Sequence, residues 1–335
     1  MSQGLRKLRC GLLALAVAGV LLPVTANAAS CMTEAQMTAA ERDALAATAR
    51  NLVGQVQTGN VAGLRAETIP SVAAQFDAIA GAANRLKPMV QNATITVDNL
   101  YGLDASTEPA GSAKTEFYCG SPVVMLTFNN LPPGKYGLAI VHATGVPKPQ
   151  QISLILSQEN GNRWMLAGFL NRPMVEGGHN GIWYWEQARQ YAAKNQKWSA
   201  YLYYQAAAYL LNPAQFVSSP NFQKLNREMD QSKPANVPGA KPMMLDANGA
   251  AFAINYVGTT TEFGGLDLEV RYQPNPQQMA ELRNPVQARQ QMIAVMKALT
   301  TDYPELRSAF HGIWVRAISG NVSVFALDLP MGQIQ

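Results

Sequence analysis

The stretch that decides the fold is residues 152–170, ISLILSQENGNRWMLAGFL. Two apolar runs with a period of two flank the tetrapeptide ENGN (159–162), and Asn-Gly between such runs is a strong signal for a β-hairpin. The same period of two recurs in four earlier segments, at residues 95–101, 115–118, 123–128 and 136–143. We therefore expect a sheet of antiparallel strands.

Two helical patterns precede these strands. Apolar residues recur at helical spacing over 45–56, where Gly59-Asn60 ends the helix, and again over 69–83. Helices followed by a run of antiparallel strands are typical of an α+β domain with its helices on one face of a curved sheet. We expect such a domain over residues 32–175.

This order of elements resembles the nuclear-transport-factor-2-like or cystatin-like α+β cone. The resemblance rests on the helix–Gly59-Asn60–helix start and on the closing strand WMLAGF (164–169). It implies a curved sheet around an internal pocket. A β-sandwich over residues 93–172 is the alternative, because LPPGKY (131–136) looks like a turn of small exported immunoglobulin-like or prealbumin-like modules.

Residues 176–231 predict a helical hairpin followed by a third helix, with Ser219 as the N-cap of the third. Small and aromatic residues are spaced across the pair as in a tetratricopeptide repeat, which residues 183–213 resemble. A solenoid needs about three repeats to be stable, and the sequence contains one. We therefore expect a single tetratricopeptide-like hairpin packed on its neighbours.

A proline-rich segment without apolar periodicity follows, and it predicts a linker over residues 232–247. The patterns over residues 248–335 then predict a strand pair, a helix that begins at Pro285, and a second strand pair. These elements would form a small α+β domain. The fold class expected for the whole chain is therefore multidomain α+β.

An export signal is predicted at residues 1–28. Three basic residues precede an apolar stretch (11–22), and Ala26-Asn27-Ala28 gives the small-residue pattern of a signal peptidase site. The stretch is shorter than the about 20 residues that a membrane-spanning helix needs. We expect cleavage and a periplasmic or secreted protein with no transmembrane segment in its mature chain.

The cysteines agree with export. Cys10 lies in the predicted signal, so Cys31 and Cys119 remain as a pair in an oxidising compartment, and we expect a disulfide between them. Lipidation of Cys31 is the rival interpretation, since AASC (28–31) faintly resembles a lipoprotein box. That box usually has Leu where Ala28 stands, which favours the disulfide.

Composition excludes several classes of function. Charged residues are 14% of the 335, against ~25% in typical soluble chains. Residues 1–28 hold three of the 26 basic residues and none of the 22 acidic ones, so the remaining chain carries a formal charge of +1. No basic run is left to follow phosphates, and we expect no nucleic-acid partner. No metal-ligand spacing, phosphate-binding loop or dinucleotide fingerprint occurs, so we expect no metal and no cofactor.

Catalytic candidates are few, because the chain has three histidines. His142 lies in a predicted strand and, with Asp98 and Tyr101, would face the internal pocket of a cone-shaped domain as an acid or base. The competing interpretation is an ordinary histidine with a hydrogen-bond partner. His311 precedes Gly312 at a predicted helix end, where it would cap carbonyl groups.

Aromatic residues gather in the predicted helical hairpin, where residues 183–209 hold nine of the chain's 27. Trp183 and Trp185, beside the glycine-flanked His179, are interpreted as binding anchors for a glycan or another periplasmic or envelope protein. The alternative interpretation is an interdomain core. We expect an exported non-catalytic binding or scaffold protein; the alternative is a small-ligand binder or enzyme with a pocket in the N-terminal domain.

Overall fold

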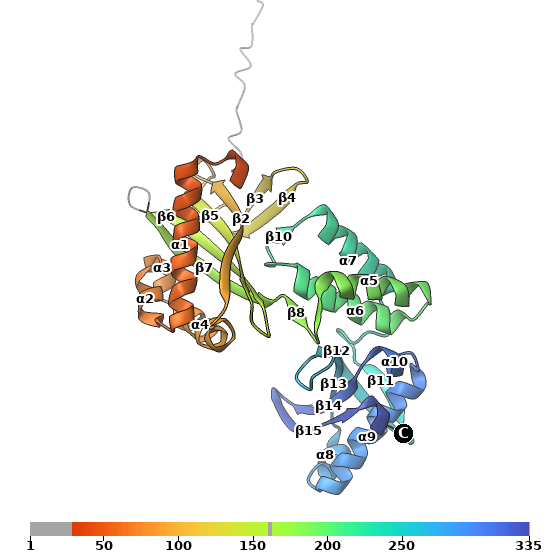
Figure 1. Ribbon diagram of the computed structural model, residues 1–335. Helices are drawn as coiled ribbons and strands as arrows, with labels where there is room; N and C mark the ends of the chain where they lie inside the picture. Colours follow the sequence, from red (N-terminus) through yellow and green to blue (C-terminus); the bar gives the residue numbers. More distant parts are fainter. Residues whose placement is uncertain (1–28, 160–162, 335) are drawn as a thin grey trace, which may run out of the picture.

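The computed structural model describes residues 29–159 and 163–334, which form an N-terminal body, a helical segment and a C-terminal body (Figure 1). Helices combine with sheets that are mostly antiparallel, which confirms the expected α+β class. The predicted export signal, residues 1–28, lies outside the described residues, as does the centre of the ENGN turn, residues 160–162.

A five-stranded antiparallel sheet with the order β1-β2-β5-β6-β7 is the centre of the N-terminal body. Its strands are β1 (Ser30–Thr33), β2 (Thr94–Asp104), β5 (Lys135–Thr144), β6 (Gln150–Glu159) and β7 (Arg163–Pro173). The last two strands pair from Glu159 and Arg163 onward, as the hairpin pattern predicts. Their continuous apolar runs follow from burial of the sheet on both faces.

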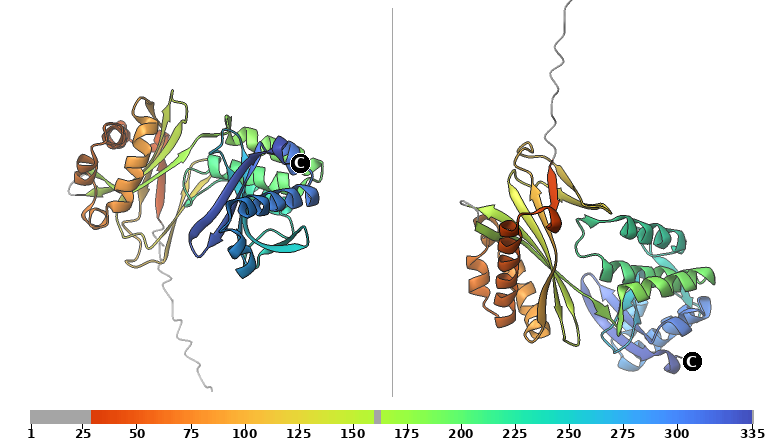
Figure 2. Two further views of the ribbon diagram at one scale, coloured as in Figure 1. Left: turned by 90° about the horizontal axis from the view of Figure 1, so that it is seen from below. Right: turned by 45° about the horizontal axis from the view of Figure 1, so that its top comes forward.

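Helices cover one face of this sheet (Figure 2). They are α1 (Ala39–Thr58), α2 (Val61–Ala66), α3 (Pro70–Ala73) and α4 (Asp77–Val90), preceded by the short 3-10 helix η1 (Glu34–Gln36). Thr38 begins α1 by accepting a hydrogen bond from the backbone N–H of Glu41, and Gly59 ends it with φ of 73°. Side chains buried between helices and sheet include Leu45, Leu52, Leu86, Val141 and Leu154.

A second, three-stranded sheet with the order β10-β4-β3 packs on the opposite face. Its strands are β3 (Lys114–Cys119), β4 (Val124–Asn129) and β10 (Val217–Ser218). Leu138 and Ile140 of β5 face this small sheet and pack near Phe117, whereas their neighbours in sequence face the helices. The body thus has helices on one face, as expected for an α+β domain, and also a second sheet, the feature of the sandwich alternative.

The helical segment begins with a two-stranded strap, β8 (Val175–Glu176) and β9 (His179–Asn180). Its helices are α5 (Gly181–Ala193), α6 (Lys197–Leu211) and α7 (Pro220–Ser232). The Asn180 side chain caps α5, and Ser219 caps α7 as predicted, each by accepting a hydrogen bond from a backbone N–H.

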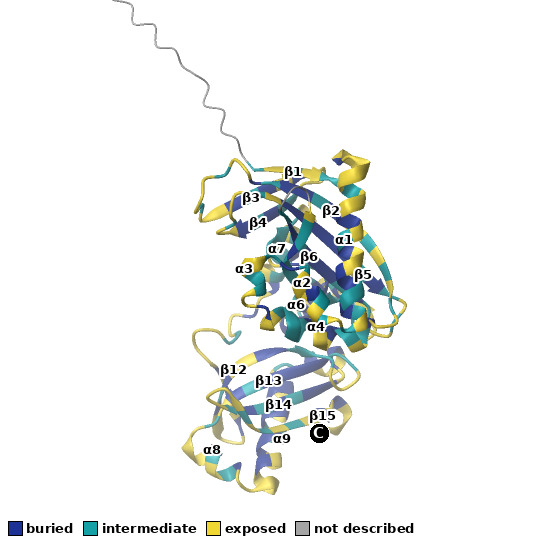
Figure 3. Cartoon of the chain, turned by 90° about the vertical axis from the view of Figure 1, so that its left-hand side faces the viewer, coloured by how far each residue is buried: buried dark blue, intermediate teal, exposed yellow. Residues whose placement is uncertain are grey.

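The C-terminal body is a five-stranded sheet with the order β11-β12-β13-β14-β15. Its strands are β11 (Met243–Ala247), β12 (Ala250–Thr260), β13 (Asp267–Gln273), β14 (Gly312–Ser319) and β15 (Val322–Pro330). The central pair β13–β14 is parallel, and the chain between its strands forms α8 (Pro276–Glu281), α9 (Pro285–Asp302) and α10 (Leu306–Ala309); η2 (Met331–Gln333) follows β15. Figure 3 shows α9 behind this sheet and the other sheet face open.

One expectation about this region is wrong. The segment predicted as a linker, residues 232–247, ends in strand β11. Met243, Leu245 and Ala247 alternate with exposed residues and contribute to the core, so the period of two is present but spans only five residues. The prolines and lysines before Met243 are typical of a linker, and a pattern of five residues was too short to outweigh them.

The helical segment and the C-terminal body share one hydrophobic core. Tyr203 of α6 donates its hydroxyl hydrogen to the carbonyl of Ala309, and its ring lies 5.6 Å from that of Phe310. Five of the nine aromatic residues between 183 and 209 are buried: Tyr184, Trp198, Tyr201, Tyr203 and Tyr204. Most of the aromatic cluster is therefore core between these two parts of the chain.

The connector between α6 and α7, residues 212–219, returns to the N-terminal body. There β10 pairs with β4, and the backbone N–H of Thr127 donates to the carbonyl of Phe216 at 2.9 Å. The Phe216 ring also lies 4.6 Å from that of Phe128, and the Ser153 hydroxyl donates to the Pro213 carbonyl at 3.1 Å. The helical segment, which shares its core with the C-terminal body, is thus joined to the N-terminal body at this connector as well as through β8.

Candidate functional site

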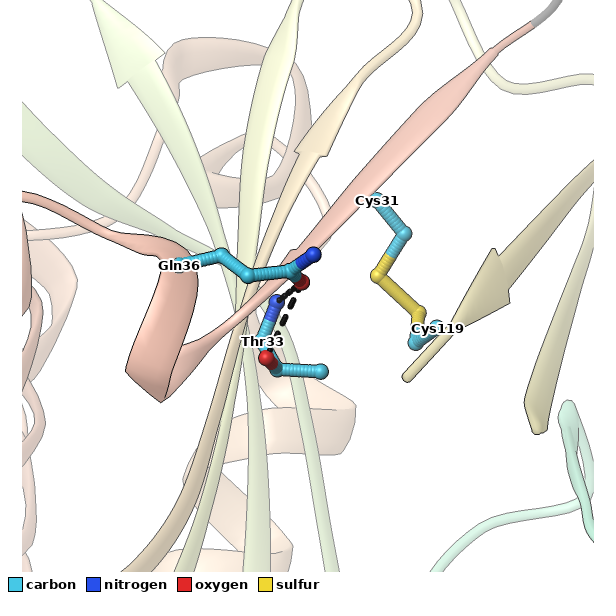
Figure 4. Close-up of a disulfide and its surroundings, with 4 residues drawn as sticks. All are labelled: Cys31, Thr33, Gln36 and Cys119. Atoms are coloured by element: carbon cyan, nitrogen blue, oxygen red, sulfur yellow. Dashed lines mark hydrogen bonds between the residues drawn. A yellow bond between two sulfur atoms is a disulfide. The ribbon is translucent and has the colours of Figure 1, made fainter. Parts of the chain in front are cut away.

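A disulfide joins Cys31 of β1 to Cys119 at the end of β3, with the Cα atoms 5.2 Å apart (Figure 4). It confirms the predicted pair and connects the edge of the large sheet to the small one. A thioether-linked lipid and a disulfide exclude each other at one sulfur, which speaks against lipidation of Cys31. The side chain of Gln36 then accepts a hydrogen bond from the backbone N–H of Thr33 at 2.9 Å as the chain turns into η1 (Figure 4).

Two of the three catalytic candidates lie together. The Nδ1 atom of His142 is 3.6 Å from a carboxylate oxygen of Asp98, and its Nε2 atom is 3.2 Å from the amide oxygen of Gln151. His142 is mostly buried, while the carboxylate of Asp98 is about half exposed. Both ring nitrogens therefore already have partners within the sheet.

Tyr101 lies further along the same strand. It pairs with Leu138, four residues from His142 on β5, which corresponds to about 14 Å along the sheet. Burial, and to a smaller extent the charge of Asp98, raise the pKa of Tyr101. None of the three candidates lines any cavity described below, so their arrangement fits the interpretation of an ordinary hydrogen-bonded histidine.

The predicted binding loop lies at the start of α5. The exposed ring of His179 stacks on Trp183 with centroids 3.6 Å apart and planes 8° apart. Trp183 also packs edge-on against Tyr184 at 5.0 Å. One face of the Trp183 indole is therefore already covered within the chain, and the exposed side of His179 forms the outer surface.

The side chain of Trp185 is held by contacts with Glu228 and Arg189. Its indole N–H donates to the carboxylate of Glu228 on α7 at 2.7 Å, and Arg189 lies over its ring at 4.4 Å. Arg189 also donates to both oxygens of Glu228, at 2.8 and 2.9 Å. Partial burial raises the pKa of Glu228, but the hydrogen bonds from Arg189 and Trp185 outweigh it, so the pKa lies below its ordinary value. Trp185 thus helps to join α5 to α7.

Sequence reasoning missed a cleft at the junction of the two bodies. Two adjoining cavities, of about 540 and 440 Å³, share the lining residues Glu176, Tyr209 and Thr261. The hydroxyl of Thr261 donates a hydrogen bond to the carboxylate of Glu176. We call the two cavities together the junction cleft.

Three parts of the chain line the junction cleft. The β12 end and the loop after it contribute Tyr256, Thr259, Thr260 and Glu262; the N-terminal body contributes Lys148, Gln150 and Asn171; and α6 contributes Gln205. Gly177 and Gly178, the two glycines that precede His179, also belong to the lining. The ring of Tyr209 is 47% exposed, with the guanidinium of Arg172 4.7 Å from its centre. The cleft thus offers hydroxyl, amide and carboxylate groups around an exposed aromatic ring.

The N-terminal body has a smaller cavity of about 240 Å³ between α1 and the end of its sheet. Apolar side chains, including Met32, Met37 and Trp164, make up much of its lining. The charged residues of the lining are Glu41, Asp104 and Lys135. The pocket expected in the N-terminal domain was assigned to His142, Asp98 and Tyr101, and none of these residues lines this cavity.

Two further properties concern the described part of the chain. In residues 29–159 and 163–334, no three His, Cys, Asp or Glu side chains are grouped so that they would hold a metal ion. None of the helices in this part has the length and apolar character needed to cross a membrane.

Comparison with known proteins gives no relative: no family model, curated protein or solved structure matches the chain.

Proposed function

We propose that this chain is an exported, non-catalytic binding protein and that the junction cleft is its binding site. The observation that carries the proposal is the lining of the cleft, where all three parts of the chain place polar side chains around the exposed ring of Tyr209. Sites at the junction of two bodies are a common place for ligands. The Cys31–Cys119 disulfide is compatible with an oxidising compartment and so with export.

The lining favours a polar ligand of the oligosaccharide class. Hydroxyl and amide groups, such as those of Thr259, Gln205 and Asn171, donate and accept hydrogen bonds as sugar hydroxyls require. Tyr209 supplies an apolar ring face with a polar edge, which suits the face of a pyranose. The carboxylates of the cleft are partly balanced by Lys148, so no strong preference for a charged ligand results.

The loop that the sequence singled out becomes the rim of this site. Gly177 and Gly178 line the cleft, and the stacked pair of His179 and Trp183 follows directly. We propose that this pair contacts the part of a ligand or envelope partner that extends beyond the cleft. Trp185, two residues further on, binds Glu228 of α7 and so supports the helix that carries this pair.

A second candidate is a small-ligand site in the cavity of the N-terminal body. Its volume of about 240 Å³ and its thioether and indole groups suit a compact apolar ligand with one charged group. We rank it second because its lining comes from one body only, whereas the junction cleft unites side chains far apart in the sequence.

Binding of the chain from residue 29 onward to an array of bacterial-envelope oligosaccharides, followed by calorimetry, tests the first candidate. For any sugar that binds, we expect Tyr209→Ala to weaken affinity at least tenfold, about 1.4 kcal/mol. Tyr118→Ala is the matched control, because Tyr118 is an exposed tyrosine of β3 (59%, against 47% for Tyr209) outside the cleft lining.

Equal affinity of Tyr209→Ala and the wild type would remove the junction cleft as the site. Loss of binding in Ala44→Trp, which places an indole in the N-terminal cavity, would then favour the second candidate. Failure of every sugar on the array to bind would reject the oligosaccharide class.

A further inference from the structure

A small cavity of about 70 Å³ lies in the C-terminal body, outside the junction cleft, at the edge where the parallel strands β13 and β14 begin. Asp267 is the first residue of β13, and His311 directly precedes β14. Its lining includes Phe263, Asp267, His311 and Asp328. These residues come from three separate parts of the sequence.

Asp267 is a buried carboxylate with one oxygen unused. Its side chain is 3% exposed, and Oδ1 lies 3.0 Å from Nδ1 of His311. Oδ2 is buried and has no hydrogen-bond partner among the described groups. Buried polar atoms in native proteins almost always have partners, so this oxygen in the wall of a cavity points to a donor that binds there.

Two glycines make room for the Asp267–His311 pair. A Cβ atom on Gly312 would lie 2.8 Å from Oδ1 of Asp267 and 2.6 Å from the carbonyl oxygen of Leu329. A Cβ atom on Gly265 would lie 2.5 Å from the Cβ of His311. Any larger residue at these positions would displace the imidazole or the carboxylate, so the backbone itself accommodates the pair.

The polar groups of this cavity are mainly acceptors. Because a carboxylate can only accept, Nδ1 of His311 is the donor in its hydrogen bond to Asp267, and in the neutral form of the ring Nε2 is then an acceptor. Asp328 adds a second carboxylate, and it forms no ion pair with a described lysine or arginine. The nearby guanidinium groups of Arg271 and Arg316 are both bound to Glu269 instead.

We propose that this cavity binds a primary alkylammonium group, as found at the end of a lysine side chain or of a free aliphatic diamine. An ammonium group has three N–H donors, which match Oδ2 of Asp267, the Asp328 carboxylate and Nε2 of His311. The volume is about twice the share of one water molecule, enough for the ammonium and its first methylene. The ring of Phe263 at the wall adds a cation–π attraction.

An organic ammonium fits better than a metal ion. No group of three His, Cys, Asp or Glu side chains in the described chain has the arrangement of a metal site. The aromatic ring of Phe263 and the apolar side chains of Ile313 and Leu329 complete the wall instead. They suit the methylene chain that continues from an ammonium group.

The test is an NMR titration of the chain from residue 29 onward, following the His311 imidazole and Trp314 indole resonances. The probes are n-butylamine, putrescine and Nα-acetyl-lysine methylamide, with tetramethylammonium as a cation that lacks N–H donors. We expect saturable shifts with the three amines and none with tetramethylammonium. Tighter binding of the lysine derivative than of n-butylamine assigns the site to a protein partner, and the reverse assigns it to free amines.

Variants of the cavity residues test whether the amines bind in this cavity. Asp267→Asn and Asp328→Asn should each weaken amine binding at least tenfold, while Asp302→Asn, which changes an exposed carboxylate of the same body, should not. Asp328 is exposed, so its variant stays informative even if Asp267→Asn fails to fold. The proposal is overturned if a folded wild-type protein shows no saturable shift with any amine, which leaves the cavity to water, or if Asp328→Asn binds as the wild type does.

Discussion

Glu269 on the open face of the C-terminal sheet holds two arginine side chains at once. Arg271 donates to both of its oxygens, at 2.7 and 2.9 Å, and Arg316 donates to one at 3.0 Å. Burial raises the pKa of Glu269, but the hydrogen bonds from the two guanidinium groups outweigh it and hold the pKa below its ordinary value. The carboxylate therefore stabilises the fold in its charged form.

The direction of that pKa shift predicts the pH dependence. A pKa lowered by folding contributes stability above the unfolded value of about 4.3, and the contribution is lost as pH falls through the folded pKa. We expect Glu269→Gln to lower the free energy of unfolding at pH 7 by about 3 kcal/mol, since it leaves two cations without their partner. The gap to the wild type should shrink below about pH 4.

Urea unfolding at a series of pH values measures this gap. Glu186→Gln, at an exposed glutamate of α5, is the control and should leave stability unchanged at every pH. A gap for Glu269→Gln that stays constant from pH 7 to about pH 3 would contradict the role assigned to the charge.

The Cys31–Cys119 bond predicts a second effect at the scale of single residues. It closes a loop between residues separated by 88 positions, which is worth about 4.6 kcal/mol in the chain-entropy model. We expect the double variant Cys31→Ser/Cys119→Ser to lose stability by that order in urea unfolding. Intact mass of the wild-type protein should show no free thiol; two alkylatable thiols in the native protein would refute the pairing.

Most of the element α6 is buried: every residue from Trp198 to Tyr204 is buried, and only Lys197 and Tyr209 are exposed. Ala200 and Ala207 are completely buried, so a tryptophan in either place would overpack the core. We expect Ala207→Trp to cost about 1–3 kcal/mol of stability. Gln190→Trp, at an exposed position of α5, is the control. A control on α6 itself at Gln205 is unsuitable, because Gln205 lines the junction cleft. Equal melting temperatures for the two variants would rule out the packed hairpin.

Elements that are marked by long periodic patterns or by local turn and capping signals were predictable from the sequence. The β6–β7 hairpin and the N-terminus of α7 follow from an Asn-Gly turn and from Ser219-Pro220, because those signals act between neighbouring residues. By contrast, β10 has two residues and β11 five, too few for a period to stand out. Both strands form because a partner strand, distant in sequence for β10, supplies their hydrogen bonds.

In the candidate sites, too, local features were predictable from the sequence and contacts between distant segments were not. Local sequence singled out the glycine-flanked His179 and the aromatic residues between 183 and 209, with Trp183 and Trp185 as the expected anchors. It gave no sign that Glu176 meets Thr261, which lies 85 positions away, or that His311 meets Asp267. Those contacts depend on how the bodies pack and on the parallel β13–β14 pair, and no local pattern encodes either.

At the scale of the whole molecule, two connections hold the bodies on either side of the junction cleft. The β8–β9 strap continues from β7 into α5, and the connector between α6 and α7 returns to pair β10 with β4. Because the connector contacts the N-terminal body through Pro213, Phe216 and β10, the cleft walls are fixed at two points. We infer that the cleft changes its width less than a site with a single hinge would.

The second connection also decides what happens if the backbone is cut. A protease site inserted at the exposed Gly178 would divide the chain into a piece with the large sheet and a piece that still carries β10. We expect the two pieces to elute together in size-exclusion chromatography, and to separate more readily when Phe216→Ala weakens the β10–β4 contact. Immediate separation of the wild-type pieces would contradict this.

If the two pieces stay together, the contacts of β10 and its connector with the N-terminal body make the protein comparable to a two-chain complex that is made as one polypeptide. Its halves could be produced separately, divided at Gly178, and would reassemble by adding a strand to a waiting sheet edge. The covalent link at the strap would then serve mainly to raise the local concentration of one half near the other.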